Sequence, residues 1–139
     1  MTDGVGSGFL SLAATVVRML FGGPRTGVPK LTAFVVAEPV RGRKLEVRAR
    51  VTNAGDAGVT IDMVLLMVEG REWRRGDVAT LELRSGPKPP FRLDAYDSAA
   101  WKSTIRLQDW MTQRGAKCTL SVYGAGASAH TERRIPVRA

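Results

Sequence analysis

The chain offers few side chains that could carry out nucleophilic or acid–base chemistry. His130 is its one histidine and Cys118 its one cysteine, so the two cannot supply the four ligands of a structural zinc site. A histidine-based triad would require Cys118 or a serine to come beside His130 through folding. Cys118 alternates with the apolar Leu120 and Val122, and this pattern favours a small core residue over a nucleophile.

The acidic and glycine-rich stretches are better explained as turns and caps than as ligand sites. Asp94 and Asp97 flank a turn, and Asp77 follows Gly76, whereas a calcium loop needs further closely spaced acids around a glycine. A phosphate-binding loop follows a strand and contains a lysine. The glycine-rich stretch at 4–8 follows no predicted strand and contains no lysine. We therefore expect no catalytic residues, no metal, no cofactor and a protein that is not an enzyme.

Positive charge is the chain's main chemical property. It has 21 Lys and Arg against 13 Asp and Glu, a formal net charge of +8, which favours anionic partners such as nucleic acid, acidic lipid or an acidic protein. Glu46 interrupts the predicted basic face and no aromatic residues are interleaved with it, so base stacking is not indicated and a solvated sheet face is the simpler explanation. The predicted basic surface consists of Lys44, Arg48, Arg50, Arg71, Arg74 and Arg75.

A regular alternation from residue 44 to residue 52 is the clearest structural signal. Charged and polar side chains occupy one face and apolar ones the other, as in a half-buried β-strand whose inward residues are Leu45, Val47, Ala49 and Val51. Residues 53–58 form a predicted turn. A second strand then runs from Val59 to Val68 and is apolar on both sides toward its end.

After residue 30, the sequence pattern predicts several more short strands separated by turns. Pro39 and Gly42 are expected to end the first strand, and residues 124–128 to join the last two as a hairpin loop. One or two helical turns are expected at 108–114, and the further strands at 31–38, 78–84, 91–93, 101–105, 117–123 and 131–138. The pattern predicts a mainly β fold, an antiparallel immunoglobulin-like β-sandwich of seven or eight strands that lacks the cysteine pair of antibody domains.

The amino-terminal segment differs from the rest of the chain. Residues 9–21 are its most apolar run, and the polar members Ser11, Thr15 and Arg18 would share one narrow stripe of a helix of about four turns. Ser7 is the expected N-cap, and the glycines and proline after residue 21 are the expected stop. The predicted organisation is a helical arm and linker at 1–29 and a β-sandwich at 30–139.

A helix that is apolar nearly all round has to be covered. The run is too short for a transmembrane span and contains an arginine, and its leader lacks the basic residues of a secretory signal, so neither membrane insertion nor export is expected. The helix can instead dock on its own domain or insert into a neighbouring subunit. The residues expected to make that contact are Phe9, Leu10, Leu12, Val16, Val17, Met19, Leu20 and Phe21.

Two stretches carry a resemblance to a known group of domains. Residues 47–55 (VRARVTNAG) and 91–101 (FRLDAYDSAAW), with the closing hairpin, resemble small immunoglobulin-like domains of actinobacteria and their tailed phages, over roughly residues 31–139. The resemblance implies a structural or adhesive module, often on a virion. It supplies no functional residues to carry across, and the amino-terminal helix is not part of its pattern.

These observations lead us to expect a non-enzymatic structural protein, a subunit of a larger assembly attached through its apolar helix. By the resemblance, the assembly would be a phage virion, with the chain as a capsid decoration or minor capsid protein. The expected partners are other protein subunits, such as a major capsid protein, with the chain present as a homo-oligomer or in repeated copies. The expected location is a virion assembled in the host cytoplasm. The alternative is a basic β-sandwich module that binds nucleic acid or another acidic surface.

Overall fold

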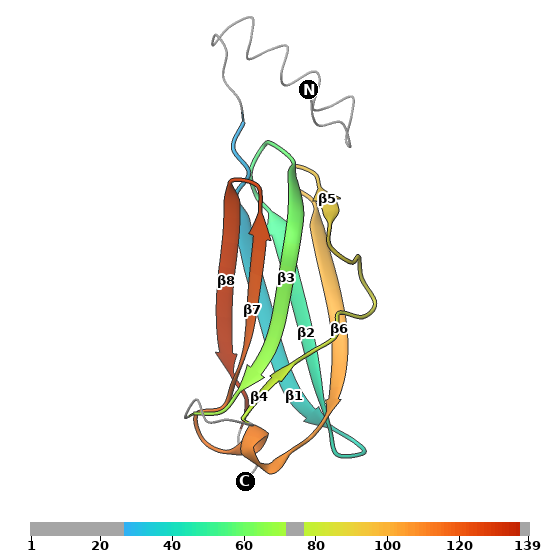
Figure 1. Cartoon of the computed structure of the whole chain (residues 1–139), viewed down its shortest axis with the longest axis vertical. Helices are drawn as coiled ribbons and strands as arrows, with labels where there is room; N and C mark the ends of the chain where they lie inside the picture. Colours follow the sequence, from blue (N-terminus) through green and yellow to red (C-terminus); the bar gives the residue numbers. More distant parts are fainter. Residues whose placement is uncertain (1–26, 72–76, 137–139) are drawn as a thin grey trace, which may run out of the picture.

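The computed structural model describes residues 27–71 and 77–136, and within these ranges the regular secondary structure is antiparallel β-strand apart from one 3₁₀ turn (Figure 1). The predicted helix at 9–21 lies outside the described residues. No helix in the described ranges has the length and apolarity needed to cross a membrane. The elements in chain order are β1 (Leu31–Val40), β2 (Lys44–Asn53), β3 (Val59–Glu69), β4 (Val78–Thr80), β5 (Phe91–Leu93), β6 (Ser98–Arg106), a 3₁₀ turn η1 (Asp109–Thr112), β7 (Lys117–Gly124) and β8 (Ala127–Arg134).

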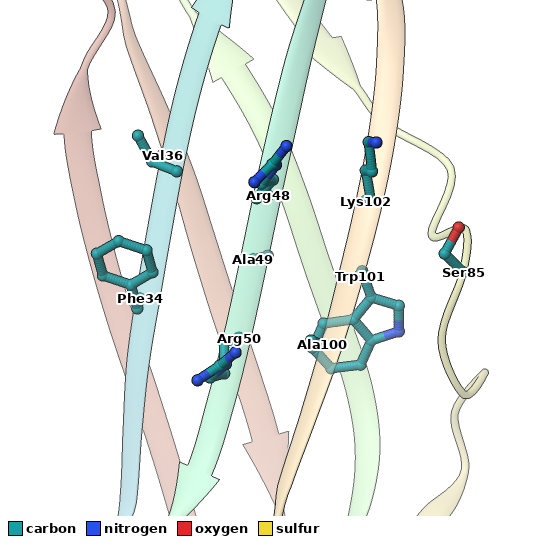
Figure 2. Close-up of a pocket in the computed structure, with 9 residues that line it drawn as sticks. All are labelled: Phe34, Val36, Arg48, Ala49, Arg50, Ser85, Ala100, Trp101 and Lys102. Carbon is teal, nitrogen blue, oxygen red and sulfur yellow. The ribbon is translucent and has the colours of Figure 1, made fainter.

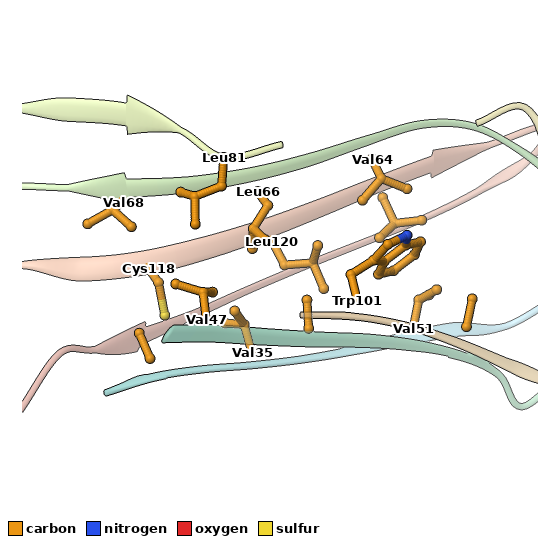
Figure 3. Close-up of a cluster of buried hydrophobic side chains, with 14 of the residues drawn as sticks. Val35, Val47, Val51, Val64, Leu66, Val68, Leu81, Trp101, Cys118 and Leu120 are labelled. Carbon is orange, nitrogen blue, oxygen red and sulfur yellow. The ribbon is translucent and has the colours of Figure 1, made fainter. Parts of the chain in front are cut away.

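The strands form two sheets that pack face to face. One sheet has the order β1–β2–β6, and the other has the order β4–β3–β7–β8 with β5 paired to β3. Apolar side chains from both sheets meet between them and form the core (Figure 3). The predicted mainly β, antiparallel fold is confirmed, in an arrangement consistent with a β-sandwich.

Strand β2 follows its sequence pattern closely. Leu45, Val47, Ala49 and Val51 are buried, whereas the charged residues between them face outward. The strand lies between β1 and β6, with both of its neighbours antiparallel. A strict period of two in one strand therefore determines which residues form the outer face of this sheet.

Two strand ends differ from the prediction. Pro39 does not end the first strand but lies within β1, opposite Leu45, because β1 is an edge strand on which a missing N–H donor is tolerated. The last strand begins at Ala127 rather than at 131, so the predicted hairpin loop is shorter. Gly126 takes φ 79° in this turn, a conformation that glycine adopts without steric penalty.

The predicted strand at 78–84 ends early. Only Val78–Thr80 pairs as β4 with β3, and the backbone N–H of Leu81 then donates to the carbonyl of Leu66. Beyond that point the chain crosses to the other sheet, where the N–H of Lys102 donates to the carbonyl of Arg84. The segment thus covers part of the β6 edge instead of extending β4.

The one or two helical turns predicted at 108–114 are a single 3₁₀ turn, η1. The backbone N–H of Met111 donates to the carbonyl of Gln108, and the buried Met111 side chain fixes the turn against the core. Gly115 follows with φ 96°, which closes the turn before β7 begins.

Candidate functional site

The outer face of the β1–β2–β6 sheet carries the charged half of the β2 pattern. The strand register places Phe34 of β1 and Ala100 of β6 on either side of Arg50. In the next row, Arg48 lies between Val36 and Lys102. Apolar and cationic side chains of three strands are therefore brought together by register alone.

A hollow of about 850 Å³ lies over these two rows, and we call it the central hollow (Figure 2). Ala100, which is exposed and has a small side chain, lies on the β6 side of Arg50, and Phe34 lies on its β1 side. The central hollow is lined by Phe34, Val36, Arg48, Ala49, Arg50, Ser85, Ala100, Trp101 and Lys102.

Arg50 is the uncommitted cation of the central hollow. Its side chain has no hydrogen bond or ion pair to any other residue of the described ranges. The ring of Phe34 beside it is 51% exposed, and the guanidinium carbon of Arg133 lies 5.8 Å from the centroid of that ring. A cation–π contact from β8 thus holds an exposed aromatic ring next to a free guanidinium.

Arg48 and Lys102 are partly neutralised by Glu46. One carboxylate oxygen, Oε2 of Glu46, lies 3.2 Å from Nη2 of Arg48 and 3.2 Å from Nζ of Lys102. The hydrogen bond from Lys102 is the main cause that lowers the pKa of Glu46, and Arg48 adds to it against the opposing effect of desolvation. Glu46 therefore interrupts the basic face, as the sequence predicts, and does so by pairing with two of its cations.

The structure separates the other members of the predicted basic surface. Lys44 lies at the β1–β2 turn and lines a second hollow of about 400 Å³ together with Arg43 and Arg106. Arg71 is exposed and lies against Gly115, at the far end of β3. The remaining two members, at 74 and 75, lie outside the described residues, as do the predicted contact residues of the run 9–21.

Sequence reasoning missed Lys102, Phe34 and Ala100 as parts of the site. The alternation around Trp101 indicates that Lys102 faces outward, but it does not reveal that β6 is the strand beside β2. The alternation in the sequence shows which side chains of each strand face outward. It does not show which strands are neighbours or in which register they pair, and the site depends on both for three strands.

A second polar cluster lies on the outer face of the other sheet. Oγ of Ser121 is 2.8 Å from Nδ1 of His130, and Nε2 of His130 is 3.5 Å from Oε2 of Glu132. The same Glu132 oxygen accepts a hydrogen bond from Nζ of Lys117 at 3.1 Å, and Lys117 followed by His130 lowers the pKa of Glu132. Folding therefore does bring a serine beside the one histidine.

Within residues 27–71 and 77–136, this cluster lacks a further requirement of acyl transfer. A hydrolytic serine needs preorganised donors for the developing oxyanion, commonly backbone N–H groups. Ser121 lies in β7, which pairs with β3 on one side and β8 on the other, so the N–H groups around it serve the ladders. The arrangement is that of a polar network on an exposed sheet face.

The remaining candidate for chemistry is in the core. Cys118 is fully buried, and this burial raises the pKa of its thiol to about 11, which disfavours the reactive thiolate. In the described part of the chain, no group of three or more His, Cys, Asp or Glu side chains is placed to hold a metal ion.

Comparisons with known proteins give a likeness of fold. No protein-family model matches the chain, and no curated protein matches it either. Among solved structures, it is similar to AvmM, which catalyses macrocyclisation in alchivemycin A biosynthesis, with 12% identity, a TM-score of 0.51 and coverage of 78% of this chain and 90% of that one. At this identity the likeness concerns the fold alone.

Two further solved structures show a looser likeness. The archaellum periplasmic stator protein FlaG from Sulfolobus acidocaldarius is 13% identical with a TM-score of 0.43, over 76% of this chain and all (100%) of that one. The alkylpurine DNA glycosylase AlkC of Pseudomonas fluorescens, bound to DNA with an abasic site analogue, is 16% identical with a TM-score of 0.40, over 97% of this chain and 37% of that one.

Proposed function

We propose that the protein is a non-enzymatic immunoglobulin-like binding module that joins a larger assembly by taking an acidic partner surface on the outer face of its β1–β2–β6 sheet. The observation that carries the proposal is the uncommitted guanidinium of Arg50 beside the half-exposed ring of Phe34 in the central hollow. The predicted attachment segment at 9–21 lies outside the described residues, so the proposal depends on this sheet face.

The strand order supports the immunoglobulin-like part of the proposal. In such sandwiches the first, second and fifth strands of the common core, A, B and E, face a sheet that contains C, F and G. Here β1, β2 and β6 form one sheet, and β3, β7 and β8 lie in the other. The short β4 beside β3 corresponds to an added edge strand of the second sheet.

The composition of the central hollow favours a partner with both charge and apolar surface. A guanidinium binds a carboxylate or phosphate through two parallel hydrogen bonds. Phe34, Val36 and Ala100 add apolar area next to Arg50, which a partner's apolar side chain can cover. An acidic protein segment with an aromatic or aliphatic residue beside its carboxylate meets both features.

Nucleic acid fits the same face less well. Glu38 and Glu46 lie opposite each other in the row that separates Arg48 from Lys44, so a continuous phosphate backbone along the strands would pass an acidic row. In the described ranges, Phe34 is the one aromatic ring exposed beside Arg50, whereas single-strand binding uses successive stacking rings. These features favour a protein partner.

The nature of the assembly rests on the resemblance described above. That resemblance implies a tailed-phage virion, in which the partner would be an acidic patch of a capsid subunit. The basic sheet face is compatible with such a role because a decoration subunit needs an exposed, complementary surface rather than an active site.

The test compares two charge reversals in the full chain. Arg50→Glu changes the central hollow, and Arg106→Glu makes the same change in net charge at the second hollow. The probes are a glutamate-rich peptide with one phenylalanine, the same peptide with alanine in its place, and a generic DNA duplex, each measured by fluorescence anisotropy at low and physiological salt.

We expect the phenylalanine peptide to bind more tightly than the alanine peptide and than DNA. Arg50→Glu should weaken its binding by at least about tenfold, the factor given by about 1.4 kcal/mol, and Arg106→Glu by about twofold. Equal losses in the two variants would indicate only general attraction to a basic protein. Preferred binding of DNA would favour the nucleic-acid alternative, and no binding at low salt would refute both.

A further inference from the structure

The outer face of β3 is apolar, unlike the outer face of β2. In an antiparallel sheet with one solvated face, the outward residues are normally polar, as Arg48 and Arg50 are on β2. On β3 the outward positions instead hold Met63, Leu65 and Met67. A strand that is apolar on both faces is typical of a sheet covered on both sides.

The apolar surface reaches the neighbouring strand at Tyr123, whereas β7 carries Ser121 opposite Leu65 and Thr119 opposite Met67. Tyr123 of β7 lies opposite Met63 in the register, and their side chains are 43% and 48% exposed. An irregularity between Ile61 and Met63 leaves Asp62 exposed beside them. We call Met63, Leu65, Met67 and Tyr123 the β3 stripe.

We propose that residues 9–21 of the same chain cover the β3 stripe. This run is the most apolar segment of the sequence. In the β3 stripe, Met63 and Tyr123 are exposed and Leu65 and Met67 are half-buried. The inference is independent of the acidic partner, which occupies the opposite sheet.

The linker that joins residues 9–21 to the β-domain is short, and it meets the domain at the end where β3 starts. The N–H of Val28 donates to Oδ1 of Asp56 at 3.1 Å, and Gly27 lies against the same residue. Figure 1 shows the described chain beginning at the end of the two sheets where β3 starts, and Met63 lies four residues along that strand from Val59. Four strand residues span about 13 Å.

The linker can reach this point. The residues from 21 to 27 can extend over about 20 Å, more than the distance along β3. A run of 13 residues, if helical as predicted, would be about 20 Å long, enough to pass along the whole β3 stripe. Such a short linker also holds residues 9–21 at an effective concentration of about 1 mM near the β3 stripe. Even weak apolar contacts therefore favour binding of the chain's own run over the run of a second molecule.

Charge favours the β3 stripe over the other apolar surface of the domain. The central hollow contains Arg48, Arg50 and Lys102, which would repel Arg18 of the run. At the β3 stripe the exposed Asp62 can pair with that arginine. The apolar surface, the length of the linker and the position of the charges therefore all favour the β3 stripe as the place where residues 9–21 bind.

The proposal is testable in the full chain by hydrogen exchange of residues 9–21. Met63→Asp places a charge on the β3 stripe at an exposed position, where the fold itself tolerates it. Phe34→Asp is the matched control, because Phe34 is a similarly exposed apolar residue, at 51%, on the opposite sheet. Hydroxyl-radical footprinting of Met63 and Tyr123, with the 71% exposed Tyr96 as reference, reports the same contact from the sheet side.

We expect exchange in 9–21 to be slowed by at least about tenfold in the parent chain and in Phe34→Asp, and to be fast in Met63→Asp. Footprinting should find Met63 and Tyr123 less reactive than Tyr96, and Leu12→Asp with Val16→Asp should restore their reactivity. Fast exchange in the parent chain would overturn the proposal. If protection of residues 9–21 is lost in Phe34→Asp and kept in Met63→Asp, the run binds the other sheet. If protection is lost on dilution, the run binds a second molecule. Either result overturns the proposal.

Discussion

The carboxylate of Glu46 lies 3.2 Å from the ammonium group of Lys102, on a diagonal across the β2–β6 ladder. The residue directly opposite Lys102 is Arg48, which contacts the same carboxylate oxygen. Two cations are therefore committed to one acid, whereas Arg50 in the adjacent row pairs with no residue of the described ranges. The usable charge of this face is smaller than its composition suggests, and it is concentrated at one side chain.

Glu46 should titrate below an ordinary glutamate, whose pKa is about 4.3, because Lys102 and then Arg48 stabilise its carboxylate. A lowered folded-state pKa gives a stabilisation that is present above the unfolded value and is lost as pH falls through the folded value. Carboxyl-carbon NMR should show the low midpoint and its rise in Lys102→Met. An unchanged midpoint in that variant would contradict the assigned cause.

Filling the central hollow without changing charge should weaken binding of the acidic phenylalanine peptide. Ala100→Phe places a ring beside Arg50 on the β6 side of the central hollow, so we expect about tenfold weaker binding at an unchanged melting temperature. Thr104→Phe is the matched control, since it lies on the same strand face but outside the central hollow. Equal effects of the two substitutions would argue that the hollow plays no part.

Asn53 should be the most costly polar residue to remove. Its Oδ1 accepts hydrogen bonds from the N–H groups of Lys30 and Gly55 at 3.2 and 3.0 Å, and its Nδ2 donates to the carbonyls of Ala57 and Leu93 at 2.7 and 3.3 Å. Asn53→Ala removes all four hydrogen bonds of a fully buried side chain and leaves the buried carbonyl of Leu93 without this donor, so denaturant unfolding should show a loss of about 3 kcal/mol in the free energy of unfolding.

The control for this measurement is the neighbouring outward residue. Thr52→Ala should change the free energy of unfolding by no more than about 0.5 kcal/mol, because the Thr52 side chain has no hydrogen bond to another described residue. The one bond at this position, from Oγ1 of Thr32 at 3.5 Å, goes to the backbone carbonyl of Thr52, which alanine keeps. A loss at Asn53 no larger than at Thr52 would show that the four bonds are replaced by water.

The facing of individual side chains was predictable from sequence. The alternation of β2 assigned Val47 to the core and Arg48 and Arg50 to the surface, because a period of two depends only on neighbours in the chain. The burial of Cys118 followed from the same pattern in β7.

What lies beside a given side chain was not predictable in the same way. Phe34 and Ala100 come from strands before and after β2, and they flank Arg50 only through two antiparallel registers. Glu46 appeared as an interruption of the basic face, but its pairing with Lys102 depends on β6. The early end of β4 has the same origin, since the hydrogen bond between Lys102 and Arg84 competes for the segment that the local pattern assigned to a strand.

Cys118 should resist alkylation in the native chain at pH 8. Burial raises the pKa of its thiol to about 11, from about 8.5 for an ordinary cysteine, so little thiolate is present and the sulfur is not accessible. The neutral thiol's contribution to stability is complete below about pH 8.5 and is lost as pH rises through about 11. Mass spectrometry should show modification only at the rate of unfolding, with the chain in denaturant as the fast control. Rapid native labelling would place the thiol outside the core.

Ser121 should not behave as a catalytic nucleophile despite its 2.8 Å contact with His130. Because β7 pairs on both sides, the backbone N–H groups around Ser121 are used by the two β-ladders and do not point to an oxyanion site in the described part of the chain. Glu132 is also shared with Lys117. A fluorophosphonate probe, which modifies activated serines, should therefore leave Ser121 unlabelled after long incubation, as in Ser121→Ala. Labelling that disappears in His130→Ala would contradict this expectation and make the cluster an active site, because generic surface reactivity does not depend on a neighbouring imidazole.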